Sequence, residues 1–229
     1  MPSVRVNDID IYYELRGDGP PLVVILGLGG DISEVDGVLR GLAEHCSVLA
    51  FDNRGAGRTD KPREPYSVSM MADDTVGLMR AVGWDKAHVL GISLGGRIAM
   101  DIALRYPDVV DRLVLVSTGP RVVRNLRRRV IMGVLSRGAP RGAYPQPRYA
   151  FANQLDASGG YDCTDRLSQI TAPTLVMHGR KDKTAPYSLA EDMAERIPGA
   201  RMTTFDGGHL LVFMGERQRF VDEASAFLV

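Results

Sequence analysis

The sequence predicts an α/β fold, in which helices cover both faces of a mostly parallel central sheet. Short apolar runs, typical of strands buried on both faces, alternate along the chain with segments of helical periodicity. This alternation favours parallel strands joined by helical crossovers. The length of 229 residues, of which 45% are hydrophobic, suits one domain with a substantial core, and no internal repeat is visible.

The first half of the chain supplies two buried strands and two helices. Alternating apolar residues predict a hairpin that turns at Asn7-Asp8, and Ser67 is the expected cap of the second helix. The expected elements are a hairpin over residues 4–15, a strand over 22–26, a helix over 33–45, a strand over 47–51 and a helix over 68–82.

The second half repeats the alternation and ends in a helix. Pro173 directly precedes one of its strands, where it marks the strand's beginning. The expected elements are a strand over residues 87–90, a helix after 93, strands over 113–117 and 174–178, a helix over 187–197, a strand over 202–205 and a helix over 215–228.

A turn of the pattern G-x-S-x-G, Gly91–Gly95, joins a predicted strand to a predicted helix. Such a turn reverses the chain so sharply that its serine, Ser93, is strained, and the flanking glycines remove Cβ atoms that would clash. The hydroxyl then lies at a helix start, where free N–H groups and the helix dipole favour developing negative charge. The pattern in this context indicates a nucleophile.

A serine nucleophile needs a base to take its proton and an acid to orient that base. Of the four histidines, only His209 lies in a glycine-rich loop just past the end of a predicted strand, at the same sheet edge as Ser93. Asp182 lies in the loop beyond the neighbouring strand, and the order Ser, Asp, His is the expected one for this turn. Asp206 is interpreted as a turn residue.

The negative oxygen that forms during attack on a carbonyl needs donors already in place. The N–H of Leu94, directly after the nucleophile, is one candidate, and the N–H of Leu28 in the turn Gly27–Gly30 is the other. Asn53 and Arg54, in the polar loop after the strand over 47–51, are interpreted as hydrogen bonders that shape that loop.

With these residues placed, the chain resembles the α/β-hydrolase superfamily over nearly its whole length. The segments that carry the resemblance are LVVILGLGG, FDNRGAGRTDKP, HVLGISLGGRIAMDIALRYP, APTLVMHGRKDKTAP and FDGGHLLVF. The resemblance implies the α/β-hydrolase fold and the same five site residues, and it implies neither a metal nor an organic cofactor. The chain departs from many relatives at Leu26, where they carry histidine.

Subfamily marks narrow the activity that the resemblance implies. Ser93 differs from the aspartate nucleophile of dehalogenases and epoxide hydrolases, and Leu94 from the tryptophan of prolyl iminopeptidase-like enzymes. Ile92 and Leu210 replace the asparagine and tryptophan of many carbon–carbon bond hydrolases. A serine esterase or lactonase remains, similar to 3-oxoadipate enol-lactonases, that acts on a small substrate through an acyl-enzyme. Cofactor-free perhydrolase or haloperoxidase-like activity and a non-enzymatic ligand-binding receptor stay open as alternatives.

The spacing of 89 positions between Ser93 and Asp182 is short beside typical relatives, so we expect a reduced lid over residues 119–168, inserted into a core of 1–118 and 169–229. An apolar stripe at four-residue spacing, Val122, Leu126, Val130 and Val134, predicts a lid helix, and residues 138–147 a loop. Residues 119–155 contain no acid and eight arginines: Arg121, Arg124, Arg127, Arg128, Arg129, Arg137, Arg141 and Arg148. This basic lid could attract an anionic substrate, form a solvated face that binds nothing, or touch an anionic membrane.

The remaining composition restricts location and partners. The amino terminus has neither the apolar core of a signal peptide nor a transit pattern, and no apolar run is long enough to span a bilayer. Cys46 and Cys163 lie far apart without metal-ligand spacing, which favours a reduced, cytoplasmic setting. We expect a small-molecule ester or lactone as partner and no nucleic acid.

Overall fold

The fold is given by a computed structural model that describes residues 3–123, 144–209 and 215–229. Within these residues, eight strands form one sheet in the order β1-β2-β4-β3-β5-β6-β7-β8. The strands are β1 (Ser3–Val6), β2 (Ile9–Arg16), β3 (Pro21–Ile25), β4 (Ser47–Phe51), β5 (Ala87–Ile92), β6 (Val110–Val116), β7 (Thr174–Gly179) and β8 (Arg201–Phe205). Only the pairs β1–β2 and β2–β4 are antiparallel. The predicted α/β architecture with a mostly parallel sheet is confirmed.

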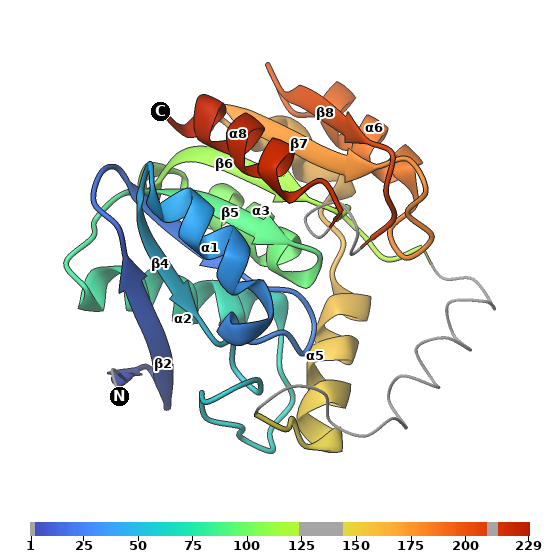
Figure 1. Ribbon diagram of the computed structural model, residues 1–229. Helices are drawn as coiled ribbons and strands as arrows, with labels where there is room; N and C mark the ends of the chain where they lie inside the picture. Colours follow the sequence, from blue (N-terminus) through green and yellow to red (C-terminus); the bar gives the residue numbers. More distant parts are fainter. Residues whose placement is uncertain (1–2, 124–143, 210–214) are drawn as a thin grey trace.

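Helices cover both faces of this sheet. The helices of the described residues are α1 (Asp36–Ala43), α2 (Val68–Ala81), α3 (Leu94–Arg105), α5 (Arg148–Gly160), α6 (Tyr187–Arg196) and α8 (Arg217–Leu228). Figure 1 shows α1 and α8 in front of the sheet and α2 and α3 behind it. Within the described residues, no helix combines the length and the apolarity that crossing a bilayer requires.

Each face of the sheet has its own apolar core, and β3 contributes to both. Leu22 and Val24 pack into the core shared with α1 and α8, whereas Val23 and Ile25 pack into the core shared with α2, α3 and α6. Successive side chains of a strand point to opposite faces, so a strand covered on both faces needs a continuous apolar run. This packing is the physical reason for the run that predicted the strand.

Most predicted elements are confirmed to within one or two residues, and the larger differences lie in three of them. The helix expected over 33–45 begins instead as a 3-10 turn, Ile32–Val35, in which Asp31 caps the N–H of Ser33, and α1 follows. The strand expected over 87–90 extends to Ile92, because pairing with β6 continues that far. The strand expected over 113–117 starts at Val110 for the same reason and ends before Ser117, which has a φ of 46°.

The helix α5 lies between β6 and β7 in the sequence and was not predicted as a separate helix. Its buried residues, Ala150, Gln154, Ala157 and Ser158, are small or polar, so no apolar stripe indicates it. The expected stripe from Leu126 onward and six of the eight arginines lie outside the described residues, and the loop expected over 138–147 is described only from residue 144.

Candidate active site

Ser93 lies between β5 and α3 in a conformation that few residues adopt, with φ 56° and ψ −112°. The chain folds so tightly here that a Cβ at Gly91 would lie 2.3 Å from the carbonyl oxygen of Gly95. A Cβ at Gly95 would lie 2.0 Å from the carbonyl oxygen of Ile25. A side chain at either position would clash with the backbone, so both positions require glycine. This steric requirement is the reason that the G-x-S-x-G pattern predicts a sharp turn.

Ser93, His209 and Asp182 meet at the carboxyl edge of the sheet. His209 Nε2 lies 2.9 Å from Ser93 Oγ, and His209 Nδ1 lies 2.7 Å from Asp182 Oδ2. In the tautomer that satisfies both contacts, Nδ1–H donates to Asp182 and Nε2 accepts the serine hydroxyl. The three side chains that the sequence singled out are thus joined by hydrogen bonds through His209.

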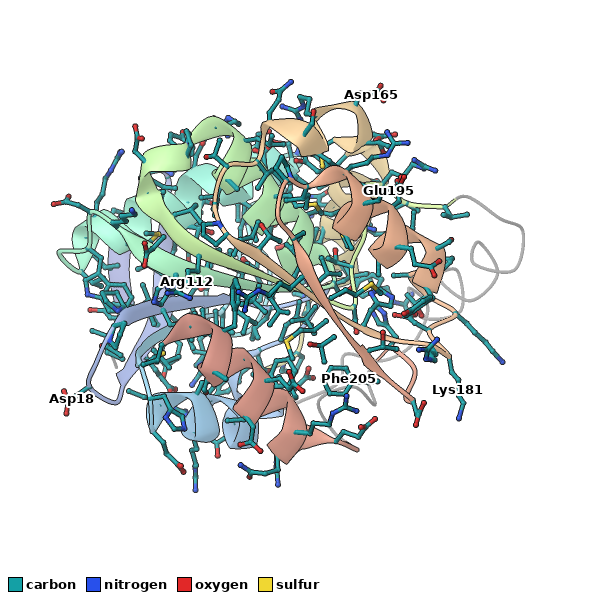
Figure 2. The ribbon with its side chains drawn as sticks, turned by 90° about the horizontal axis from the view of Figure 1, so that it is seen from above. Asp18, Arg112, Asp165, Lys181, Glu195 and Phe205 are labelled. Carbon is teal, nitrogen blue, oxygen red and sulfur yellow. The ribbon has the colours of Figure 1, made fainter. Side chains whose placement is uncertain are left out.

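The loops after β7 and β8 bring these groups together. Asp182 follows β7, and His209 follows the neighbouring strand β8. The N–H of Arg180 donates to the carbonyl oxygen of Phe205, and the N–H of Lys181 donates to that of Gly207, so the two loops are joined by backbone hydrogen bonds. Figure 2 shows Lys181, in the loop after β7, on one side of the molecule and Arg112, near the start of β6, toward the other.

Asp182 is held as a carboxylate by the groups around it. Its residue surface is 6% exposed, and its Oδ1 accepts hydrogen bonds from the N–H groups of Thr184 and Ala185 at 2.7 and 2.8 Å. Burial alone would raise the pKa of the Asp182 carboxyl, but the nearby His178 imidazole and the hydrogen bonds from His209 and Ala185 outweigh burial and hold the pKa well below its usual range. A permanent negative charge therefore faces Nδ1 of His209.

His178, at the end of β7, is a contact that sequence reasoning missed. It is fully buried, and its Nε2–H donates to the carbonyl oxygen of Ala185 at 2.9 Å while lying 3.4 Å from Asp182 Oδ2. No signal in the sequence distinguishes such a histidine from one that merely fills a strand position. The structure shows that it borders the same carboxylate oxygen as His209.

The backbone of the nucleophile is also held from the strand β6. The Ser93 N–H donates to the carbonyl oxygen of Val116 at 2.9 Å, and the Thr118 hydroxyl donates to the carbonyl oxygen of Ser93 at 2.6 Å. Thr118 is a second residue that the sequence did not indicate. These contacts bind both sides of a backbone that would otherwise relax from its strained conformation.

The turn Gly27–Gly30, which we call the oxyanion loop, approaches the nucleophile closely. A Cβ at Gly27 would lie 3.2 Å from the Cβ of Ser93, a contact so tight that one of the two segments would have to shift by a few tenths of an ångström. The N–H of Leu28 has no acceptor among the described residues, and Leu94 is the first residue of α3, where helix geometry leaves the N–H free. Both expected donors thus lie on segments that adjoin Ser93.

Asn53 and Arg54 form the loop contacts that their interpretation as loop-shaping residues requires. The Asn53 side chain donates to the carbonyl oxygen of Leu26 at 2.9 Å. The buried Arg54 guanidinium pairs with the buried Asp74 of α2 at 2.7 Å and with Asp8 of the β1–β2 turn. Carboxylates on both sides raise the pKa of Arg54 despite its burial.

Among the described residues, no group of three or more His, Cys, Asp or Glu side chains could hold a metal ion.

Comparisons with known proteins agree with this fold. Residues 20–146 match the family described as "alpha/beta hydrolase fold". A protein of Azorhizobium caulinodans named "Putative carbamate hydrolase RutD" is 30% identical, and the alignment covers 91% of each chain.

Two solved structures extend the comparison. The enol-lactonase from Burkholderia xenovorans superposes with a TM-score of 0.89 at 24% identity, over 99% of both chains, which shows a shared fold. Est816, described as an N-acyl homoserine lactone degrading enzyme, superposes with a TM-score of 0.83 at 27% identity, over the whole of both chains.

Proposed function

Because this chain belongs to the α/β-hydrolase fold family, we propose that it is a serine hydrolase that cleaves a small carboxylic ester or lactone through an acyl-enzyme on Ser93. The observation that carries the proposal is the continuous hydrogen-bonded chain from Ser93 Oγ to His209 and on to Asp182. A serine, an imidazole and a carboxylate in this order activate a hydroxyl for attack on a carbonyl.

In the first stage, His209 Nε2 takes the proton of Ser93 as Oγ attacks the ester carbonyl carbon. The carbonyl oxygen gains a negative charge, for which we propose the N–H groups of Leu28 and Leu94 as donors. The protonated His209 then gives its proton to the leaving alkoxide, the bond from carbon to that oxygen breaks, and the acyl group stays on Ser93. In a lactone, the alcohol so released remains attached to the acyl group.

In the second stage, water takes the place of the alcohol. His209 removes a proton from the water as its oxygen attacks the acyl carbon, and the bond to Ser93 Oγ breaks after His209 returns the proton to it. Asp182 remains ionised throughout, because its buried, hydrogen-bonded position lowers the pKa of its carboxyl. Its charge stabilises the imidazolium that forms in both stages.

Relatives support two substrate classes. Est816, 27% identical over its whole length, is described as degrading an N-acyl homoserine lactone, which favours an ester-type carbonyl. The relative from Azorhizobium caulinodans is named as a carbamate hydrolase, so a carbamate is the second candidate. We further propose that residues 119–168 form a reduced lid over this site and set its substrate range.

Substitution of the nucleophile tests the proposal. We expect Ser93→Ala to remain folded and to lower kcat for p-nitrophenyl acetate by at least about 10³-fold, because the acyl-enzyme cannot form. A fluorophosphonate probe should label the natural chain but not this variant, and Ser69→Ala, on the remote helix α2, should behave as the natural chain. Undiminished turnover by Ser93→Ala would refute the assignment, whereas a natural chain that neither reacts with the probe nor cleaves any ester, lactone or carbamate would favour a receptor.

A further inference from the structure

We propose that Gln154, on α5, is a positioning residue for the oxyanion loop, and that it fixes the direction of the Leu28 N–H from outside the loop. The inference rests on the proposed function, since it assigns a role in the same reaction. It starts from a side chain that is completely buried although it is polar, on a helix whose other buried residues are small.

The polar atoms of the Gln154 side chain are all engaged by backbone or by a second glutamine. Its Oε1 accepts the N–H of Gly29 at 3.0 Å and the side-chain amide of Gln146 at 3.1 Å. Its Nε2 donates to the carbonyl oxygen of Arg54 at 2.7 Å. These partners also fix the orientation of the amide, because a backbone N–H can only donate and a carbonyl oxygen can only accept.

The contact with Gly29 completes a set of three consecutive anchored peptide groups. Asn53 binds the carbonyl oxygen of Leu26, the N–H of Gly30 binds the carbonyl oxygen of Gly27, and Gln154 binds the N–H of Gly29. Each peptide group is planar, with its N–H opposite to its carbonyl. The N–H of Leu28 belongs to the middle group, so its direction is set by a group that is held on both sides.

The oxyanion loop cannot hold this geometry through its own side chains. Three of its four residues are glycine, and Gly29 has a φ of 72°, in the region that glycine enters freely. A glycine peptide can rotate at little cost once its hydrogen bond is lost. Loss of the Gln154 contact would free the peptide group between Leu28 and Gly29, so the neighbouring group that carries the Leu28 N–H would lose its support on that side and could turn away from the developing negative charge.

The same helix is bound to the core by contacts that do not touch the oxyanion loop. The Asn153 side chain donates to the carbonyl oxygen of Glu64 at 2.8 Å, and the Tyr149 hydroxyl donates to that of Lys61 at 2.7 Å. Asn153 therefore provides a matched control, because its removal weakens the docking of α5 and leaves the contact with Gly29 in place.

The test compares Gln154→Met, Gln154→Ala, Gln154→Glu and Asn153→Leu. Methionine conserves the length of the side chain, and alanine leaves room for water to solvate the freed N–H if the methionine variant does not fold. Glutamate retains an acceptor for Gly29. For each variant kcat and KM are measured with p-nitrophenyl acetate, together with Tm and the inhibition constant of a trifluoromethyl ketone, whose adduct with serine carries an oxyanion.

We expect Gln154→Met and Gln154→Ala to lower kcat by about tenfold, less than the loss that follows removal of an oxyanion donor, with KM nearly unchanged. The inhibition constant should rise by the same factor, Gln154→Glu should regain most of the activity, and Asn153→Leu should keep the natural kcat even if its Tm falls. A kcat within twofold of the natural chain in both removing variants, or an equal loss in Asn153→Leu, would overturn the proposal. If the natural chain itself neither turns over the ester nor binds the ketone, the proposed function fails instead.

Discussion

On the carboxylate of Asp182, hydrogen bonds converge from two backbone N–H groups and one imidazole, and a second imidazole lies 3.4 Å away. Each of these groups favours the charged form of the carboxyl and opposes protonation. Several donors thus stabilise the negative charge of Asp182, although solvent scarcely reaches this side chain. The ionised Asp182 therefore has two effects. It supplies the negative charge beside His209, and it makes the stability of the fold depend on pH.

We predict that Asp182 makes the free energy of unfolding fall as the pH drops below about 4. The pKa of its carboxyl is lower in the folded chain than in the unfolded one, so the stabilisation is present above the unfolded pKa and is lost as the pH falls toward the folded pKa. Urea unfolding should show that Asp182→Asn reduces the loss between pH 5 and pH 3 by about 1 kcal/mol.

The control for this prediction is Asp206→Asn, which changes an exposed carboxyl near the end of β8. That variant should follow the pH dependence of the natural chain. An Asp182→Asn variant whose stability declines as steeply with acid as that of the natural chain would show that the carboxylate is not the group responsible.

Among the elements, α5 shows most clearly why a helix could not be predicted from the sequence. The strand β3 and the helix α2 were predicted because an apolar run, a helical period and the cap Ser67 encode burial directly. The buried face of α5 carries Gln154 and small residues, and it binds backbone carbonyls in place of apolar side chains. A sequence pattern built on apolar periodicity cannot detect a helix that is docked by hydrogen bonds.

At the same scale, Arg54 ties the loop after β4 to α2, and we predict that Arg54→Met destabilises the fold by about 3 kcal/mol. The substitution leaves Asp74 buried, with the hydrogen bond from the side-chain amide of Asn7 as the polar contact that remains among the described residues. Removal of one member of a buried ion pair costs more than the pair contributes, because the other charge stays buried. Urea unfolding at neutral pH measures the change.

Arg80→Met provides the comparison, since Arg80 lies exposed on the same helix. We expect it to change the free energy of unfolding by less than about 0.5 kcal/mol. Equal stability of Arg54→Met and Arg80→Met would mean that the ion pair at Asp74 does not support the junction between the loop and α2.

Across the whole molecule, the sequence could locate the candidate site because topology restricts where loops meet. Ser93, Asp182 and His209 each follow a strand of one parallel sheet, and the carboxyl ends of such strands share an edge. Thr118, His178 and Gln154 could not be found in this way. Thr118 contacts Ser93 across 25 residues and Gln154 contacts Gly29 across 125, which no local pattern records. His178 lies only four residues before Asp182, but no pattern distinguishes it from a histidine that fills a strand position.

The uneven distribution of charge along the chain allows a test of whether the protein attracts an anionic substrate. The net charge is zero, yet residues 119–155 carry eight arginines and no acid, so the rest of the chain is negative. We predict that kcat/KM for a monoester of a dicarboxylic acid falls several-fold between about 20 mM and about 500 mM salt, because salt screens long-range attraction. The neutral amide of the same ester should change less than twofold, and replacement of Arg127, Arg128 and Arg129 by glutamine should remove the difference. Identical salt responses of the charged and the neutral ester would assign these arginines to a solvated face with no part in substrate capture.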